Sequence, residues 1–262
     1  MRRSTFAGLM ALSLSALPGC PGCDPAAPPV PPPAAPPPSA PVPTTPTPSS
    51  GKWDPAAGFG TIRGRVLVSY PVTPPAAVKV EVNADVCGPT HDPGSLLVQG
   101  GALEGCVVYL KGPDAPADWD KSGTFTMDQK TCHYVPRVLI VPVGGTVTFT
   151  SSDPFLHNVK SSYKAFNKGV SQGAEQKLLC DEAAFAGLQC NVHPFMAGLL
   201  VVAENPWYVL TDAQGSFTLT KVPVGTWKIL AQHEVLGKSV KQGTPITVTK
   251  DAETTIEVKF EK

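Results

Sequence analysis

From residue 52 onward, the sequence predicts an all-β protein. Apolar and polar residues alternate in short runs such as 78–82 and 146–150, and a period of two is typical of strands with one buried face. Gly and Pro interrupt these runs at short intervals, as they do in turns. No stretch shows the long 3.6-residue apolar period of an amphipathic helix. We therefore expect β-sandwiches built from short strands.

The first expected strands lie at 60–69, 78–82 and 106–110. In the last of these, Cys106, Val108 and Leu110 share one face, because alternate residues of a strand point the same way. Residues 87–94 are rich in Gly, Pro and Asp and predict a loop. A polar stretch containing Pro113 and Pro116 marks an expected domain boundary.

The middle of the chain contains an apolar run at 135–143, followed by Gly144-Gly145, which predicts a hairpin turn into 146–150. Residues 166–176 have no strong pattern, and 199–202 form a short apolar run. From Thr211 the pattern is again one of turns and alternation, with expected strands around 217–219, 227–229, 246–248 and 256–260.

Charge excludes one class of function. The 262 residues carry 21 basic and 21 acidic side chains, so the chain has no net charge to attract nucleic acid or anionic lipid. We expect no nucleic-acid partner.

The N-terminus has the features of a targeting segment. A basic start at residues 1–3 precedes an apolar run at 6–17 that is too short to span a bilayer. The run ends in Leu-Pro-Gly-Cys at 17–20, which resembles a bacterial lipobox. This implies a signal peptide at 1–19, lipidation of Cys20, and a cell-envelope location on the periplasmic side or the surface, lipid-anchored to the membrane. An ordinary signal peptide cut near Gly19 or Gly22 is the alternative.

A proline-rich linker follows at 20–51. Thirteen of the 30 prolines lie between Pro25 and Pro48, a composition that cannot bury a core and that favours polyproline II. At about 3.1 Å per residue, its residues 24–50 could reach on the order of 80 Å. We expect a disordered tether that acts as a semi-rigid stalk or as a passive spacer.

Seven cysteines are consistent with an oxidising compartment. If Cys20 is lipidated and Cys190 binds a metal, four others remain for two disulfides, with three possible connectivities, and Cys23 is left over. These four are Cys87, Cys106, Cys132 and Cys180. We expect Cys132 to be half of a disulfide, His133 to lie at the surface, and His91 to be a solvated side chain near Cys87.

Residues 190–196 read Cys-Asn-Val-His-Pro-Phe-Met. Cys190, His193 and Met196 recur at three-residue intervals, so one short loop can bend round a single ion. With His157 from a turn upstream, they supply one thiolate, two imidazoles and one thioether, the ligands of a trigonal copper site with a long axial sulfur. A disulfide between Cys180 and Cys190 would remove the thiolate and is the competing interpretation.

The 190–196 string resembles the C-terminal ligand loop of amicyanin-type cupredoxins, and His-Asn-Val at 157–159 resembles the upstream ligand strand of amicyanin and plastocyanin. The resemblance covers about residues 125–203 and implies a Greek-key sandwich with one type 1 copper. It implies that His157 and His193 bind through ring nitrogens, Cys190 binds as thiolate, and Met196 is the weak axial ligand.

The same resemblance implies that Asn158 hydrogen-bonds across to the other ligand loop. Val192 departs from the family, which has Pro at this position. Because Val keeps its N–H, it could donate to the Cys190 sulfur and raise the reduction potential.

The C-terminal part resembles the carboxypeptidase regulatory-like β-sandwich. The resemblance rests on Thr-Asp-Ala-Gln-Gly-Ser-Phe at 211–217 and Pro-Val-Gly-Thr-Trp at 223–227, while residues 64–110 resemble the first half of that module. We therefore expect one discontinuous sandwich split by an inserted copper domain. The expected parts are 52–118 and 204–262 for the flanking sandwich and 119–203 for the cupredoxin domain.

Together these features predict a membrane-tethered blue-copper electron-transfer protein that cycles Cu(I)/Cu(II) with a redox partner protein. The edge of His193, among Phe155, Pro194 and Phe195, is the expected electron port. An enzyme with a second copper centre would need further histidines, typically in His-x-His pairs. The chain has five histidines and no such pair, so we expect a carrier and not an enzyme. We also expect a monomer. The alternatives are a copper carrier without redox role and a metal-free binding or adhesion lipoprotein.

Overall fold

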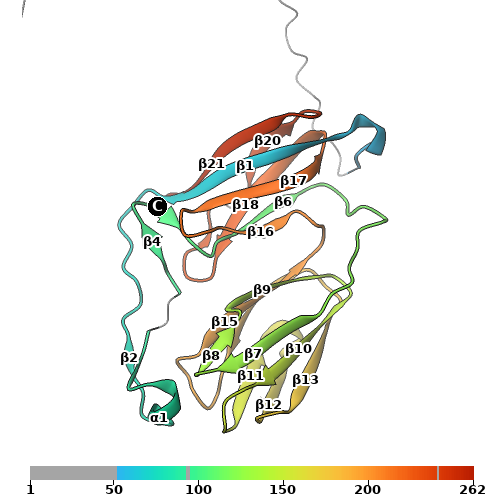
Figure 1. Cartoon of the computed structure of the whole chain (residues 1–262). Coiled ribbons are helices and arrows are strands. Elements are labelled where there is room, and N and C mark those ends of the chain that lie inside the picture. The colour runs from blue at the N-terminus through green and yellow to red at the C-terminus, as the bar shows by residue number, and fades with distance from the viewer. Residues whose placement is uncertain (1–51, 93–94, 241) are drawn as a thin grey trace, which may run out of the picture. The chain divides into compact units, whose positions relative to one another are not determined.

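The computed structural model describes residues 52–92, 95–240 and 242–262, and this part is all-β (Figure 1). The expected signal peptide, Cys20 and the proline-rich tether lie outside the described residues. Within the described ranges, no helix is long and apolar enough to cross a bilayer. The helical segments there are η1 (Pro55–Ala57), α1 (Ala84–Cys87) and η2 (Tyr163–Ala165).

The flanking sandwich is made of two sheets that each combine strands from both ends of the described chain. In the first sheet, β1 pairs antiparallel with β17 and parallel with β21. In the second sheet, β6 lies between β16 and β18. The first sheet contains β1 (Phe59–Val68), β4 (Val98–Gln99), β5 (Ala102–Leu103), β17 (Ser216–Pro223) and β21 (Glu253–Phe260). The second contains β6 (Val107–Lys111), β16 (Tyr208–Leu210), β18 (Gly225–His233), β19 (Gly237–Lys238) and β20 (Thr244–Val248).

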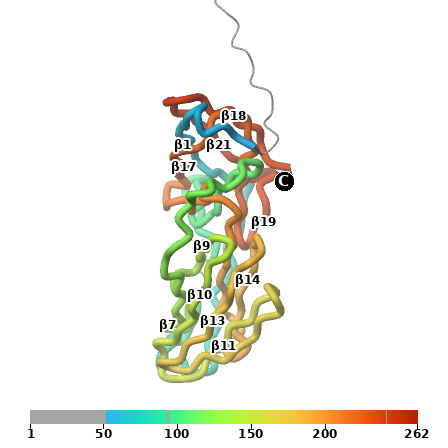
Figure 2. The backbone as a smooth tube through the Cα atoms, turned by 90° about the vertical axis from the view of Figure 1, so that its right-hand side faces the viewer, coloured from blue at the N-terminus to red at the C-terminus, as the bar shows by residue number. Residues whose placement is uncertain are grey.

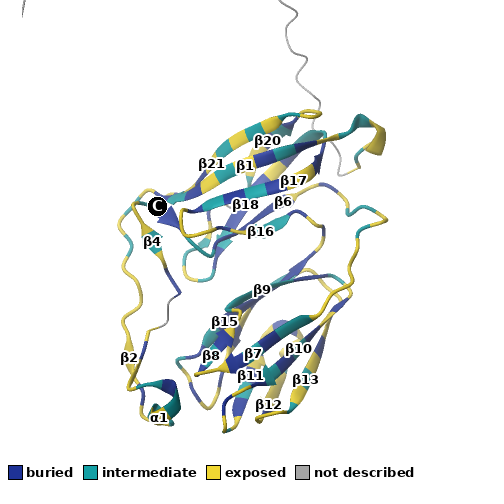
Figure 3. Ribbon diagram, viewed as in Figure 1, coloured by how far each residue is buried: buried dark blue, intermediate teal, exposed yellow. Residues whose placement is uncertain are grey.

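The two halves of the flanking sandwich share one core. Cys106, Val108 and Leu110 from the first half pack with Trp227 and Phe260 from the second. Burial alternates along β1, as Figure 3 shows, because one face of the strand covers this core. Strands from both ends of the described chain therefore share these sheets and this core.

The inserted sandwich, β7–β15, lies between the two halves in sequence (Figure 2). One sheet has the order β13-β10-β7-β8 and the other β12-β11-β14-β15-β9. The first contains β7 (Phe125–Lys130), β8 (His133–Val135), β10 (Gly145–Ser151) and β13 (Glu175–Cys180). The second contains β9 (Val138–Pro142), β11 (His157–Ser161), β12 (Asn167–Val170), β14 (Ala184–Gln189) and β15 (Ala197–Ala203).

Three sequence expectations differ from the structure. Gly144-Gly145 does not form a hairpin, because β9 and β10 belong to different sheets. Residues 166–176, which have no clear pattern, contain β12 and the start of β13. The expected strand at 78–82 is shorter: β2 (Val78–Lys79) pairs with β3 (Thr90–His91), and α1 lies between them.

The segment 78–91, here called the strap, packs on the inserted sandwich. Val80 and Cys87 are buried in the core of the inserted sandwich, although they fall within the expected first part of the flanking sandwich. The strap leaves the flanking sandwich after β1 and returns to it at β4.

Candidate metal centre

The second sheet of the inserted sandwich brings the metal-ligand candidates together at one end. Its central strand, β14, pairs antiparallel with β11 through Lys160 opposite Gln189, and with β15 through Gln189 opposite Ala197. In an antiparallel pair, the residues before Lys160 lie beside those after Gln189. His157, the first residue of β11, is thereby placed against the loop 190–196.

Three side-chain atoms converge at this end of the sheet. Cys190 Sγ lies 3.9 Å from His157 Nδ1 and 3.9 Å from His193 Nδ1, and the two nitrogens are 3.1 Å apart. A point equidistant from all three is about 2.1 Å from each, close to the roughly 2.0–2.3 Å of metal–nitrogen and metal–sulfur bonds. The donor set of one sulfur and two imidazoles therefore fits a single copper ion.

Hydrogen-bond donors surround the Cys190 sulfur. The backbone N–H groups of Asn158 and His193 donate to it at 3.3 and 3.4 Å. Burial alone would raise the pKa of the thiol, but the His157 side chain and the N–H groups of His193, Asn158 and Val192 lower it below its usual value. The site favours the thiolate, which is the form that binds a metal.

The His157 ring is fixed by a buried carboxylate. Its Nε2 lies 2.8 Å from Asp153 Oδ2, and His157 and Asp153 are 0% and 3% exposed. Asp153 also accepts the backbone N–H groups of Thr131 and Cys132 at 2.7 and 2.9 Å. With Nε2 protonated and donating to Asp153, Nδ1 is left as a lone pair facing Cys190, an arrangement common for metal-binding imidazoles.

The His193 ring has an equivalent outer partner. Its Nε2 lies 3.0 Å from Asn83 Oδ1, an oxygen contributed by the strap 110 residues upstream. Because that oxygen can only accept, Nε2 carries the proton and Nδ1 faces Cys190. Burial lowers the pKa of His193, and a protonated His157 would lower it further. Both effects favour the neutral, ligating form of the His193 ring.

Two further residues hold the ligand strands in register. Asn158 Oδ1 accepts the Asn191 N–H at 3.3 Å, so Asn158 hydrogen-bonds to the loop that carries Cys190. The buried Tyr134 hydroxyl lies 2.9 and 2.8 Å from the backbone oxygens of Asn158 and Gln189, which share its one donor proton. These bonds link β11 to the end of β14 next to the converging donors.

Met196 is fully buried in the core that contains Cys190. Its N–H donates to the His193 oxygen at 2.9 Å, which closes the turn of the ligand loop just before β15. The structure thus places all four ligand candidates at one end of the inserted sandwich.

Cupredoxins are among the solved structures similar to this chain. A purple cupredoxin from Nitrosopumilus maritimus is 26% identical over 30% of this chain and 99% of its own, with a TM-score of 0.28. A reduced amicyanin variant is 25% identical over 38% of this chain and 100% of its own, with a TM-score of 0.29. A copper-containing nitrite reductase from Thermus scotoductus is 22% identical over 35% of this chain and 25% of its own, with a TM-score of 0.30.

No protein-family model matches the sequence, and no curated protein is similar to it. The structural similarity covers roughly a third of this chain.

The cysteine pairing is simpler than the expected two disulfides. Cys87 bonds to Cys132, while Cys106, Cys180 and Cys190 are free and buried. Cys106 lies in the core of the flanking sandwich and Cys180 in that of the inserted one, so these two cannot meet. The competing Cys180–Cys190 disulfide is not formed.

Two expectations about histidines are wrong. The His193 edge does not form a surface port, because His193 is 0% exposed. His91 is not solvated: it is 2% exposed, and its ring lies 4.3 Å from that of His133 and 4.6 Å from that of Phe195. Both results come from the packing of the strap on the inserted sandwich, which brings Asn83 to His193 and His91 to Phe195. The sequence pattern did not indicate this packing.

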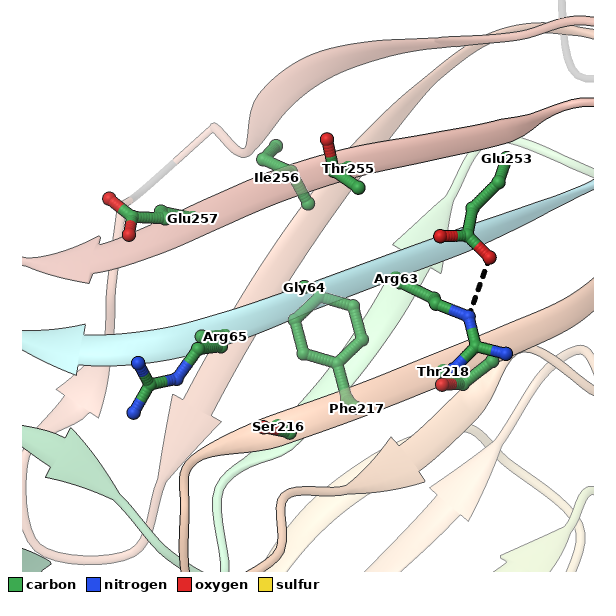
Figure 4. A pocket seen from close by; sticks show the side chains of 10 residues that line it. All are labelled: Arg63, Gly64, Arg65, Ser216, Phe217, Thr218, Glu253, Thr255, Ile256 and Glu257. Carbon is green, nitrogen blue, oxygen red and sulfur yellow. Dashed lines mark hydrogen bonds and ion pairs between the residues drawn. The ribbon is translucent and has the colours of Figure 1, made fainter. Parts of the chain in front are cut away.

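A shallow groove on the first sheet of the flanking sandwich has no comparable chemistry. Arg63 pairs with Glu253 at 2.6 Å, and the Phe217 ring lies over Gly64 between β1 and β17 (Figure 4). The paired side chains are 58% and 50% exposed, so solvent screens their interaction. We assign no role to this groove.

Proposed function

We propose that this protein is an electron carrier with one type 1 copper, held by His157, Cys190 and His193, with Met196 as the weak axial ligand. The observation that carries the proposal is the convergence of one sulfur and two Nδ1 atoms, each nitrogen belonging to a ring whose Nε2 is already hydrogen-bonded. The Nδ1 lone pairs of the two rings therefore remain available to bind a metal ion.

When bound, copper supplies a one-electron Cu(I)/Cu(II) couple. The chain contributes a rigid and dry site: His157, His193 and Met196 are fully buried, and Cys190 is 2% exposed. Asp153 and Asn83 keep the rings from turning, and the strand register keeps the sulfur in place. A scaffold that does not rearrange between oxidation states lowers the barrier to electron transfer.

We propose a carrier rather than an enzyme, because every metal-ligand cluster among the described residues contains His157 or His193, so the clusters mark one site and not two. The partner would be another redox protein that forms a transient and small interface. The lipobox-like stretch ending at Cys20 supports lipid anchoring in the cell envelope, and a tether of this kind raises the local concentration near a membrane-bound partner. We further propose that the protein acts as a monomer.

The test is a visible spectrum of the Cu(II)-loaded protein, followed by a redox titration. We expect a strong absorption band in the orange-red that disappears on reduction and returns on reoxidation. The Cys190→Ser variant should lose the band, whereas Cys180→Ser, which alters a free thiol in the same core, should keep it.

A copper-loaded wild type without the band contradicts the type 1 assignment. A band that does not respond to mild reductants contradicts electron transfer and favours copper carriage instead.

A further inference from the structure

The strap, residues 78–91, belongs in sequence to the flanking sandwich but covers the metal centre of the inserted one. Val80 and Cys87 are buried in the inserted core, and the Cys87–Cys132 disulfide bonds the strap to the residue that precedes β8. The sulfur atoms of Cys87 and Cys132 and one ring nitrogen of His193 all lie within 4.8 Å of one another. The covalent attachment is therefore adjacent to a proposed copper ligand.

Asn83 is oriented for His193 and not for its own helix. It directly precedes α1, a position where an Asn side chain commonly caps the helix, yet it makes no side-chain cap hydrogen bond. Its backbone is left-handed, with φ of 59°, a conformation that Asn and Gly tolerate best. The carboxamide instead accepts from His193 Nε2 at 3.0 Å.

The far end of the strap covers the ligand loop as well. The His91 ring packs on Phe195, which lies between His193 and Met196 in sequence. Both ring nitrogens of His91 are buried without a hydrogen-bond partner, a state that costs free energy compared with contact with water. This cost opposes closure of the strap, and the Cys87–Cys132 disulfide holds the strap against the inserted sandwich.

We propose that the strap is a cap that closes the histidine edge of the metal centre, with Asn83 as a positioning residue for His193 and the Cys87–Cys132 disulfide as the latch. The proposal rests on the proposed function, because it concerns access to the same copper. A dithiol reductant opens the latch: the S–S bond breaks, the reductant supplies two electrons and two protons and becomes a disulfide, and Cys87 and Cys132 become thiols. The strap then opens and exposes His193.

The first experiment measures how fast bathocuproine disulfonate, a Cu(I) chelator, removes copper from the full-length protein loaded with Cu(I) while the Cys87–Cys132 disulfide is intact. The doubly substituted variant Cys87→Ser/Cys132→Ser should lose copper faster by on the order of tenfold or more, because opening of the strap limits access. Val82→Ser is the matched control, since Val82 lies on the strap but is 53% exposed. It should lose copper at the wild-type rate.

The second experiment uses hydrogen–deuterium exchange on the metal-free protein. Amides at 80–91 should exchange faster in the double variant and in wild type treated with a dithiol, while β14 and β15 keep their protection. Unchanged exchange at 80–91 overturns the cap, and so does a chelation rate that matches wild type. Because this readout needs no copper, it separates failure of the cap from failure of copper binding.

The role of Asn83 is tested with Asn83→Gly, which keeps the left-handed backbone and removes the carboxamide, and Asn83→Asp, which keeps an acceptor oxygen. We expect Asn83→Gly to shift the reduction potential, because the hydrogen bond to His193 is lost. In Asn83→Asp, which can still accept that hydrogen bond, the potential should lie closer to the wild-type value. Equal potentials for wild type and Asn83→Gly overturn the positioning role.

Discussion

Both sandwiches bury an unpaired cysteine, yet the two thiols differ in their chemistry. Cys106, in the flanking sandwich, is 0% exposed, and burial raises its pKa far above the usual value, opposed only by a backbone hydrogen bond at Gln232. Cys190, in the inserted sandwich, is 2% exposed, but its pKa is lowered by donors from His157 and the surrounding loop. Burial alone does not decide whether a thiol becomes a ligand. The donors around it do.

The same contrast applies to buried histidines. His233, at the end of β18, accepts the Val235 N–H through Nδ1. Among the described residues, it belongs to none of the clusters that could hold a metal ion. His157 and His193 each have an outer partner on Nε2 and a free Nδ1 facing the sulfur. A buried imidazole becomes a ligand where its neighbours fix one nitrogen and direct the other toward further donors.

The largest expected effect is a difference in copper-dependent stability between variants of Cys106 and Cys190. Copper should stabilise wild type and Cys106→Ser against unfolding by about 4 kcal/mol at a free copper concentration near a thousand times Kd, whereas Cys190→Ser should gain almost nothing. Thermal unfolding with and without Cu(II) measures this. Retention of the full copper-dependent stabilisation in Cys190→Ser would refute the ligand role of this sulfur.

The next effect concerns His233. Burial and the nearby Arg137 lower the pKa of its ring from 6.5 to about 4. Because the unfolded chain binds the proton more tightly, stability is complete above pH 6.5 and falls as the pH drops from 6.5 to 4, by about 3 kcal/mol in total. Chemical denaturation across this range should show a smaller loss in His233→Gln. Equal slopes for the two proteins would contradict this origin.

A smaller effect is expected at the partner of His157. Asp153→Asn keeps one oxygen, which can still accept the Thr131 N–H. It replaces Oδ2, the acceptor of the Cys132 N–H and of His157 Nε2–H, with an NH₂ group and removes the charge. Copper affinity should fall by roughly 10–100-fold, measured by competition with a chelator. Asp128→Asn is the matched control, because Asp128 accepts from Thr150 and Ser152 and not from a histidine. Equal losses in both variants would point to a general effect of lost carboxylates.

The smallest expected effect is at Val192. Its N–H is among the groups that lower the Cys190 pKa, so Val192→Pro removes one donor to the sulfur and should lower the reduction potential by about 20–60 mV. Val192→Ala keeps the N–H and should stay near wild type. Voltammetry that finds the Pro variant unchanged or higher would reverse this assignment.

Much of the fold was predictable because strand alternation is local. The strands at 60–69, 106–110 and 146–150 correspond to β1, β6 and β10. The hypothesis of a split sandwich came instead from the resemblance of 64–110 and 211–227 to the two halves of one module. Predictions failed where the structure of a segment depends on which strand it pairs with. β12 was missed because residues 167–170 are mostly polar and exposed, and the turn at Gly144-Gly145 joins two sheets rather than two paired strands.

The sequence by itself predicted the proposed ligand set, because Cys190, His193 and Met196 lie within one seven-residue loop and the neighbours of His157 resemble a known ligand strand. Only the tertiary structure decided how the two rings are held and covered. Asp153 lies four residues before His157, and that spacing was a usable signal. Asn83 gave none: it reaches His193 across 110 residues of chain, and such a contact depends on how the strap packs, not on any local pattern.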